Sequence, residues 1–164
     1  MSELLDLRTV NATWQLGPCA EVRVGEHVTR YVRRGSGPGV VLLGVDAGAN
    51  PLWSPLVAAL GTSHRLIIPQ PPPNGAVEIA CLRGFIEGIG LSDVVLIAGG
   101  AAVAPAVELT GADDFIVRKL VVLADESTIT PGDPRILAVP MSWSPAAAVS
   151  AIEKFLRTAS PHGS

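Results

Sequence analysis

The stretch that decides the fold is VVLIAGGAAV, residues 94–103. Its first half is a short, continuous apolar run, which is typical of a strand covered on both faces within a parallel sheet. Gly99 and Gly100 then permit a sharp turn, and the small residues that follow can begin a helix. A buried strand that turns at once into a helix predicts one unit of an α/β sheet.

Alternating strands and helices are predicted on both sides of this stretch. Each predicted strand is a short apolar run, and each predicted helix repeats apolar residues every three or four positions. This rhythm favours a mostly parallel sheet with helices on both faces. The expected elements are strands at 40–43, 65–69, 93–97, 117–124 and 136–139, and helices at 53–60, 76–89, 101–109 and 145–156.

The N-terminal part has a different pattern. Residues 14–24 and 27–34 are two strand-like runs separated only by Gly25 and Glu26, which predicts an antiparallel hairpin before the parallel strands. A chain of 164 residues suits one domain and buries roughly 70% of its unfolded surface. We therefore expect a single α/β domain over residues 1–164, with flexible ends at 1–12 and 157–164.

Composition and charge exclude several classes of partner. Hydrophobic residues make up 48% of the chain, yet no apolar run reaches the roughly 20 residues of a membrane helix. The net charge is −3, and no basic cluster is denser than Arg30, Arg33 and Arg34. A nucleic acid or an anionic membrane surface would need a stronger positive patch. No nucleic-acid and no membrane partner is therefore predicted.

Cofactor and targeting signals are also missing from the sequence. Cys19 and Cys81 lack the spacing of a metal site or of a disulfide framework, so both are expected to be free thiols. Gly99 and Gly100 belong neither to a G-x-G-x-x-G pattern nor to a phosphate loop with its lysine. The first residues are too acidic for a secretory signal. We therefore expect no metal, no cofactor and a cytoplasmic protein.

Four stretches, taken together with their spacing, resemble the α/β-hydrolase family. They are YVRRGSG at 31–37, VVLLGV at 40–45, FIEGIGLSDVVLIAGG at 85–100 and VRKLVVL at 117–123. The likeness extends over about residues 28–125, and the apolar stripe of the last predicted helix matches the family's last helix. The resemblance implies a minimal α/β-hydrolase-like core. In this family a serine, a histidine and an acid perform catalysis at the carboxyl edge of the sheet.

The family's catalytic serine has no counterpart here. The centre of its G-x-S-x-G turn falls on Gly100, which has no side chain to attack a carbonyl. The small residues that flank this turn fall on Ala98 and Ala102, so the tight geometry of the turn is retained. The family's His-Gly pair falls on Gly44 and Val45, where the amide of Val45 can still face a bound oxygen.

The family's histidine and lid are missing as well. Between about Asp125 and Pro145 the chain is too short for a lid, an acid-bearing strand and a histidine loop together. The histidines are His27, His64 and His162, and none of them lies in that interval. The resemblance therefore implies a truncated, lidless member without a catalytic triad, and no catalytic residue is assigned.

Several residues could still bind a ligand around the former active site. Asp46 can act as an acid, a base or a ligand contact, or simply cap a turn. Asp125 and Ser127 follow a parallel strand at the edge where ligands bind in open α/β sheets, or cap the next turn. Trp143 can form a pocket floor or an interaction surface, or take a core or staple role for the last helix. The candidate pocket residues are Gly44, Val45, Asp46, Gly99, Gly100, Ala101, Asp125, Ser127 and Trp143.

Three functional hypotheses follow from the sequence. The first is a catalytically degenerate, lidless pseudoenzyme that acts as a binding or protein-interaction module, with a homo-oligomer, a protein partner or a small apolar ligand as its partner. The second is an enzyme of another type, such as a proton-transfer enzyme, a cyclase or a hydrolase with a relocated site, acting on a small carbonyl compound. The third is one part of a split assembly, whose partner supplies the missing strand and histidine.

Overall fold

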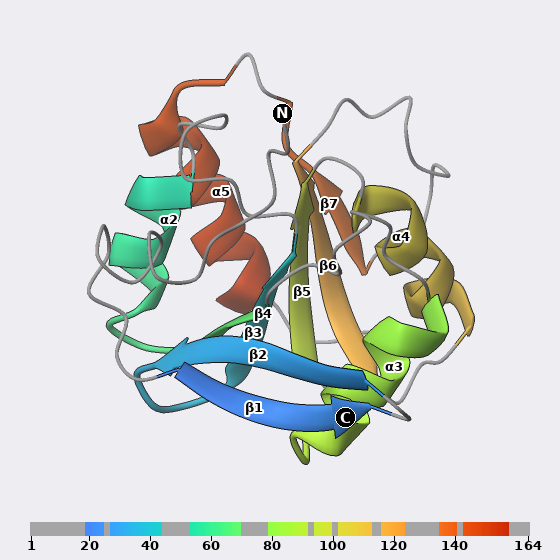
Figure 1. Ribbon diagram of the computed structural model, residues 1–164. Coiled ribbons are helices and arrows are strands. Elements are labelled where there is room, and N and C mark those ends of the chain that lie inside the picture. Colours follow the sequence, from blue (N-terminus) through green and yellow to red (C-terminus); the bar gives the residue numbers. More distant parts are fainter. Residues whose placement is uncertain are drawn as a thin grey trace, which may run out of the picture.

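A seven-stranded sheet with helices on both faces forms the molecule (Figure 1). The computed structural model describes residues 19–24, 27–43, 53–69, 79–91, 94–99, 102–112, 116–123, 135–140 and 143–157. The strands are β1 (Cys19–Val24), β2 (His27–Arg34), β3 (Gly39–Leu43), β4 (Arg65–Pro69), β5 (Val94–Gly99), β6 (Val117–Leu123) and β7 (Ile136–Ala138). The helices are α2 (Trp53–Leu60), α3 (Ile79–Gly88), α4 (Val103–Ala112) and α5 (Pro145–Arg157).

The strand order is β1-β2-β4-β3-β5-β6-β7, and the five strands from β4 to β7 run parallel. β1 and β2 form the predicted antiparallel hairpin, in which Val24 pairs with His27. β2 then joins β4 in antiparallel orientation. The predicted fold class, a mostly parallel sheet entered by an antiparallel hairpin, is therefore confirmed.

The predicted boundaries of helices and strands are correct where turn-forming residues mark the ends of an element. α2 and β4 begin and end at the predicted residues. β5 continues two residues beyond its predicted end, to Gly99, and α4 extends to Ala112. Helix and strand ends fray, so sequence patterns locate the ends of elements less well than their centres. α5 includes Arg157, while residues 1–18 and 158–164 lie outside the described residues.

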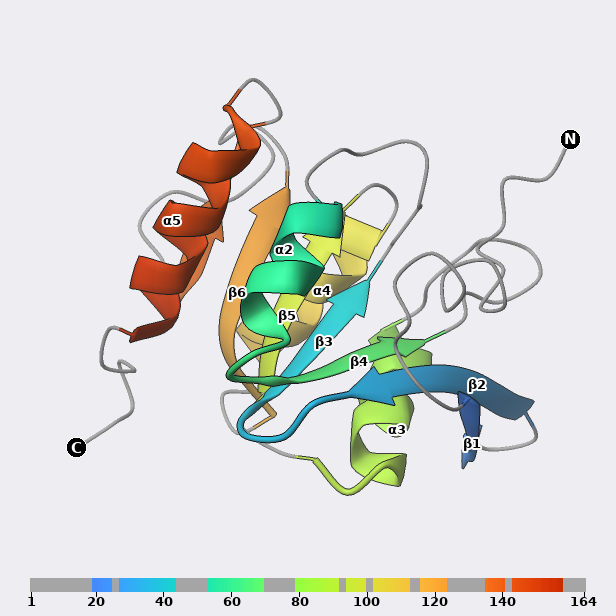
Figure 2. The ribbon, with the colours of Figure 1, turned by 90° about the vertical axis from the view of Figure 1, so that its left-hand side faces the viewer.

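The sheet separates two apolar clusters. α2 and α5 cover one face of the sheet (Figure 2). Trp53, Leu56 and Ile152 are buried together beneath them. α3 and α4 cover the other face, where Phe85 and Leu109 are buried. β3 and β5 contribute to both clusters because their alternate side chains point to opposite faces. This double coverage explains why these strands are apolar without interruption.

The β1–β2 hairpin packs against α3. A Cβ added at Gly88 would lie only 2.9 Å from Cγ2 of Val22, so the helix backbone closely approaches β1. The rings of Tyr31 and Phe85 meet edge to face, with centroids 5.5 Å apart. On the outer side, Arg30 and Glu21 form a solvent-exposed ion pair at 3.9 Å, which contributes little to stability.

The turn between β2 and β3 requires glycine. Gly35 has a φ of 85°, and a Cβ added there would lie 2.6 Å from the carbonyl oxygen of His64. The turn therefore packs directly on the backbone that leads into β4. None of the helices in the described ranges is long and apolar enough to cross a membrane.

Candidate functional site

The candidate site lies where β3, β5 and β6 end. Leu43 pairs with Ala98, and Gly99 pairs with Leu123, so the carboxyl ends of the three strands meet at one edge of the sheet. In open α/β sheets this is the edge where ligands bind. In Figure 1 it is the upper edge, and the helices that follow the strands run back toward the lower one.

Most of the candidate pocket residues follow directly on these strand ends. The structure places Gly99 and Trp143 but gives no description of the remaining candidates. Those that lie outside the described residues are Gly44, Val45, Asp46, Gly100, Ala101, Asp125 and Ser127.

Gly99 makes room for a buried indole. A Cβ at this position would lie 3.3 Å from Cζ2 of Trp53 and 3.9 Å from Cβ of Leu123. The first of these distances is tighter than most real contacts of a Cβ atom, so a larger residue would press on the ring. The glycine therefore has a packing reason, independent of any ligand that binds at the strand end.

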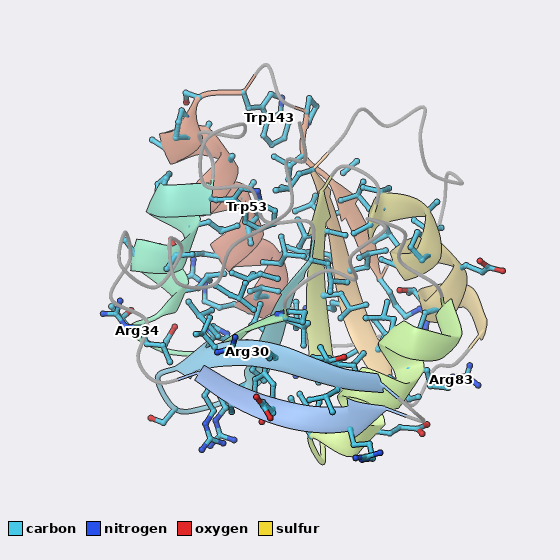
Figure 3. The ribbon with its side chains drawn as sticks, in the orientation of Figure 1. Arg30, Arg34, Trp53, Arg83 and Trp143 are labelled. Carbon is cyan, nitrogen blue, oxygen red and sulfur yellow. The ribbon has the colours of Figure 1, made fainter. Side chains whose placement is uncertain are left out.

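Trp53 is the residue that sequence reasoning left out of the site. It is the first residue of α2 and only 1% exposed, and it belongs to the cluster between α2, α5 and the sheet. Its ring lies beside Gly99 at the end of β5. Figure 3 shows Trp53 toward the carboxyl edge of the sheet. A tryptophan at the start of a helix that follows a parallel strand was the available signal.

The turn between β5 and α4 is short. β5 ends at Gly99 and α4 begins at Val103, so three residues join the two elements. Ala98 and Ala102, the predicted small flanking residues, are both buried, at 0% and 1% exposure. Pro105 is the third residue of α4, and its missing N–H is tolerated in a first turn. The predicted strand and helix on either side are thus present, while Gly100 and Ala101 of the predicted turn lie outside the described residues.

Trp143 lies on the surface rather than in the core. Its side chain is 41% exposed, and its backbone N–H donates to the carbonyl of Pro140 at 3.2 Å. Figure 3 shows it at the same end of the sheet as Trp53. Ser144 follows and caps α5, since its Oγ accepts the N–H of Ala147 at 3.2 Å. A core position for Trp143 is therefore wrong, whereas a staple role at the start of the last helix, a pocket floor and an interaction surface stay predictions.

The described serine–histidine pair is in the wrong place for the family's chemistry. Ser63 Oγ and His64 Nδ1 lie 2.8 Å apart, in the turn before β4, at the amino edge of the sheet. Burial and the positive charge of Arg118 lower the pKa of His64, while a hydrogen bond to the Leu60 backbone and the charge of Glu153 oppose them. The pair lies at the opposite edge from the β5–α4 turn, so this imidazole cannot serve as a base there.

Metal binding has no support within the described ranges. They contain no group of three histidine, cysteine, aspartate or glutamate side chains that could hold an ion. At the carboxyl edge the described residues offer apolar support, and the part of the chain that the structure describes adds no titratable side chain there.

Comparison with known proteins finds the fold but no close relative. No protein-family profile and no curated protein sequence matches the chain. Carboxylesterase CesB from Bacillus subtilis superposes with a TM-score of 0.59 at 17% identity, over 71% of this chain and 46% of the esterase. An epoxide hydrolase from Vigna radiata gives 0.57 at 18% identity, over 73% of this chain and 43% of the hydrolase.

A third solved structure, a serine hydrolase of carbazole degradation, has a TM-score of 0.52 at 22% identity, over 65% of this chain and 47% of the hydrolase. The chain thus has the α/β-hydrolase fold. It spans less than half the length of the enzymes that it resembles. At these identities the likeness establishes the fold alone.

Proposed function

We propose that this chain is a catalytically degenerate α/β-hydrolase-like protein that acts as a binding or protein-interaction module. The observation that carries the proposal is the residue at the β5–α4 turn. The strand, the helix and the buried Ala98 and Ala102 that frame the turn are in place, and the sequence has Gly100 at its centre. Glycine has no nucleophilic atom, so the serine chemistry of the fold has no starting point there.

The distribution of histidine supports the same proposal. A serine hydrolase needs an imidazole within hydrogen-bond reach of its nucleophile. His64 lies at the amino edge of the sheet, and no histidine occurs between β6 and the end of α5 in the sequence. The serine, the histidine and the lid of the family thus all lack a counterpart in the sequence. This combined loss is what we expect of a protein that binds a partner or ligand and no longer performs catalysis.

A binding role is supported by the apolar surface at the start of α5. Trp143 is 41% exposed, and Pro145, Ala146 and Ala147 behind it are exposed as well. A tryptophan on such a surface offers a large apolar contact with little loss of conformational entropy. We propose that this surface contacts the protein's partner, for which a second copy of the chain is the simplest choice.

A fluorophosphonate probe tests the loss of catalysis. We expect the full chain to remain unlabelled, and Gly100→Ser to remain unlabelled as well, because His64 lies at the opposite edge of the sheet and the sequence has no histidine between β6 and the end of α5 to activate the introduced hydroxyl. Stoichiometric labelling of a serine in the unaltered protein, located by peptide mass spectrometry, would disprove the proposal. Turnover of small carbonyl compounds that Asp46→Asn or Asp125→Asn abolishes would instead favour an enzyme with relocated residues.

The binding role is tested through Trp143. Light scattering coupled to size-exclusion chromatography should give the mass of a homodimer, and Trp143→Ala should shift the equilibrium to the monomer. Ser150→Ala, a change at another exposed position of α5, is the matched control and should leave the mass unchanged. A protein that is monomeric at all concentrations, and whose Trp143 fluorescence responds to no apolar ligand, would contradict the module.

A further inference from the structure

The strongest feature outside the candidate site is a buried lysine under α5. Lys119 lies on β6, opposite Val95 of β5, and its side chain is 0% exposed. It shares its face of the strand with Val121 and Leu123, which belong to the apolar cluster beneath α2 and α5. A charged residue in such a row costs free energy of desolvation, so its contacts need an explanation.

Lys119 contacts the last turn of α5. Its Nζ donates a hydrogen bond to the carbonyl oxygen of Phe155 at 2.5 Å and lies 5.0 Å from the centroid of the Phe155 ring. α5 ends at Arg157, so this carbonyl is one of the last four of the helix, where carbonyl oxygens accept hydrogen bonds from groups outside the helix. The ammonium group thus sits at the negative end of the helix dipole.

The apolar contacts of α5 oppose a slide along its axis only through the different sizes of its buried side chains. Its buried residues Ala148, Ile152 and Leu156 follow one another at intervals of four. A slide of one turn along the helix axis, about 5.4 Å, would still place apolar groups over the same surface, although with a poorer fit. Such a slide would, however, move the Phe155 carbonyl away from Lys119 and leave a buried charge without this partner.

We propose that Lys119 is a positioning residue that selects one axial position of α5 against the sheet. Trp143 and Ser144 directly precede the helix, at the end far from Lys119. A contact that fixes the last turn of α5 along the helix axis therefore also fixes how far Trp143 extends toward the carboxyl edge of the sheet. The proposal concerns the placement of the helix, and it stands whether or not Trp143 contacts a partner.

Lys119→Met in the full chain tests the proposal, because methionine fills a similar volume without charge or donor. The chain has three tryptophans, so three indole N–H signals are expected in an NMR spectrum, and the one that Trp143→Phe removes reports on the start of α5. The amides of α3, which packs on the other face of the sheet, are the internal reference. We expect the Trp143 signal to split or broaden in Lys119→Met while the amide signals of α3 stay single. Amide protection in α5 should fall by about tenfold or more, with β3 and β5 unchanged.

Two further variants make the outcome decisive. Lys154→Met replaces an exposed lysine of α5 and should leave the indole spectrum and the protection of α5 as they were. Lys119→Gln keeps a donor and should retain more protection in α5 than Lys119→Met. A single Trp143 signal with full protection of α5 in Lys119→Met would overturn the proposal. Failure of Lys119→Met to fold would overturn it too, because Lys119 would then be required by the whole fold.

Discussion

Single residues decide what the segment between β5 and α4 can do. In the proposed function Gly100 stands where the family has its nucleophile, whereas its neighbour Gly99 has a packing role, since it leaves space for the ring of Trp53. The sequence predicted the turn from the two glycines together. It did not separate their roles, because the contact with Trp53 joins residues that are far apart in the chain.

Gly99→Ala should destabilise the protein by about 1–3 kcal/mol, because the new methyl group would meet the buried indole at 3.3 Å. Gly111→Ala is the matched control. An added Cβ there meets nothing within 4 Å, and the helical position should gain up to about 1 kcal/mol. Urea unfolding of both variants measures the difference. Equal stabilities for the two variants would refute the steric role of Gly99.

His64 should titrate below its ordinary value of 6.5, since burial and Arg118 lower its pKa. Arg118→Gln should raise this pKa, and Glu153→Gln should lower it further, in titrations followed by NMR. The unfolded chain binds more protons than the folded one between the lowered value and 6.5, so the folded protein should lose stability as the pH falls through that window. His64→Gln should abolish this part of the pH dependence, and a pH profile that is the same with and without His64 would contradict the assignment.

At the scale of elements, the sequence predicted every described strand and helix, with errors confined to their ends. The apolar runs of β3 and β5 predicted burial on two faces, and the stripe of α5 predicted its packing through Ile152 and Leu156. Lys119 could not be predicted as a core residue, because its burial depends on a backbone carbonyl of another element. Periodicity contains no such information.

The start of α5 depends on Ser144. Its Oγ accepts the N–H of Ala147, one of the amides at the helix start that otherwise lack a partner. Ser144→Ala should therefore cost about 1 kcal/mol of stability, as measured by thermal or urea unfolding. Ser150→Ala lies on the same helix at an exposed position and should be neutral or slightly stabilising. A loss of the same size in both variants would argue against the cap.

Lys119 should give the protein a pH dependence in alkaline solution. Its burial and the neighbouring Arg118 lower its pKa from 10.5, so the unfolded chain binds more protons than the folded one just below that pH. Stability should accordingly rise with pH through this window, relative to Lys119→Met. Urea unfolding at a series of pH values measures the difference between the two proteins. If the difference in the free energy of unfolding between the two proteins is the same at every pH, the pKa of Lys119 is the same in the folded and the unfolded chain, and the prediction is wrong.

At the scale of the whole molecule, the sequence predicted where the strands lie along the chain better than it predicted their order in the sheet. The right-handed rule for parallel connections limits the choices, and the resemblance to α/β-hydrolases selects one of them. The site was predicted only as an edge of the sheet. Its residues in the segments after β3, β5 and β6 lie outside the described residues, so their roles remain predictions.

Hydrogen exchange should reflect the strand order. β3 and β5 have strands on both sides and apolar clusters on both faces, so their amides should exchange slowest. β1 and β7 are the outermost strands and should exchange first. Mass spectrometry of exchanged peptides makes this comparison directly. Protection of β7 equal to that of β5 would indicate that another chain covers this edge.

The division of the interior by the sheet has a consequence for engineering. A substitution at Leu56 or Ile152 changes one cluster, and a substitution at Phe85 or Leu109 changes the other, with no shared side-chain partner. When one substitution is made in each cluster, the two changes in the free energy of unfolding should add. Two substitutions within one cluster should show coupling in double-mutant cycles. The two halves of the core can therefore be randomised in separate libraries and recombined afterwards.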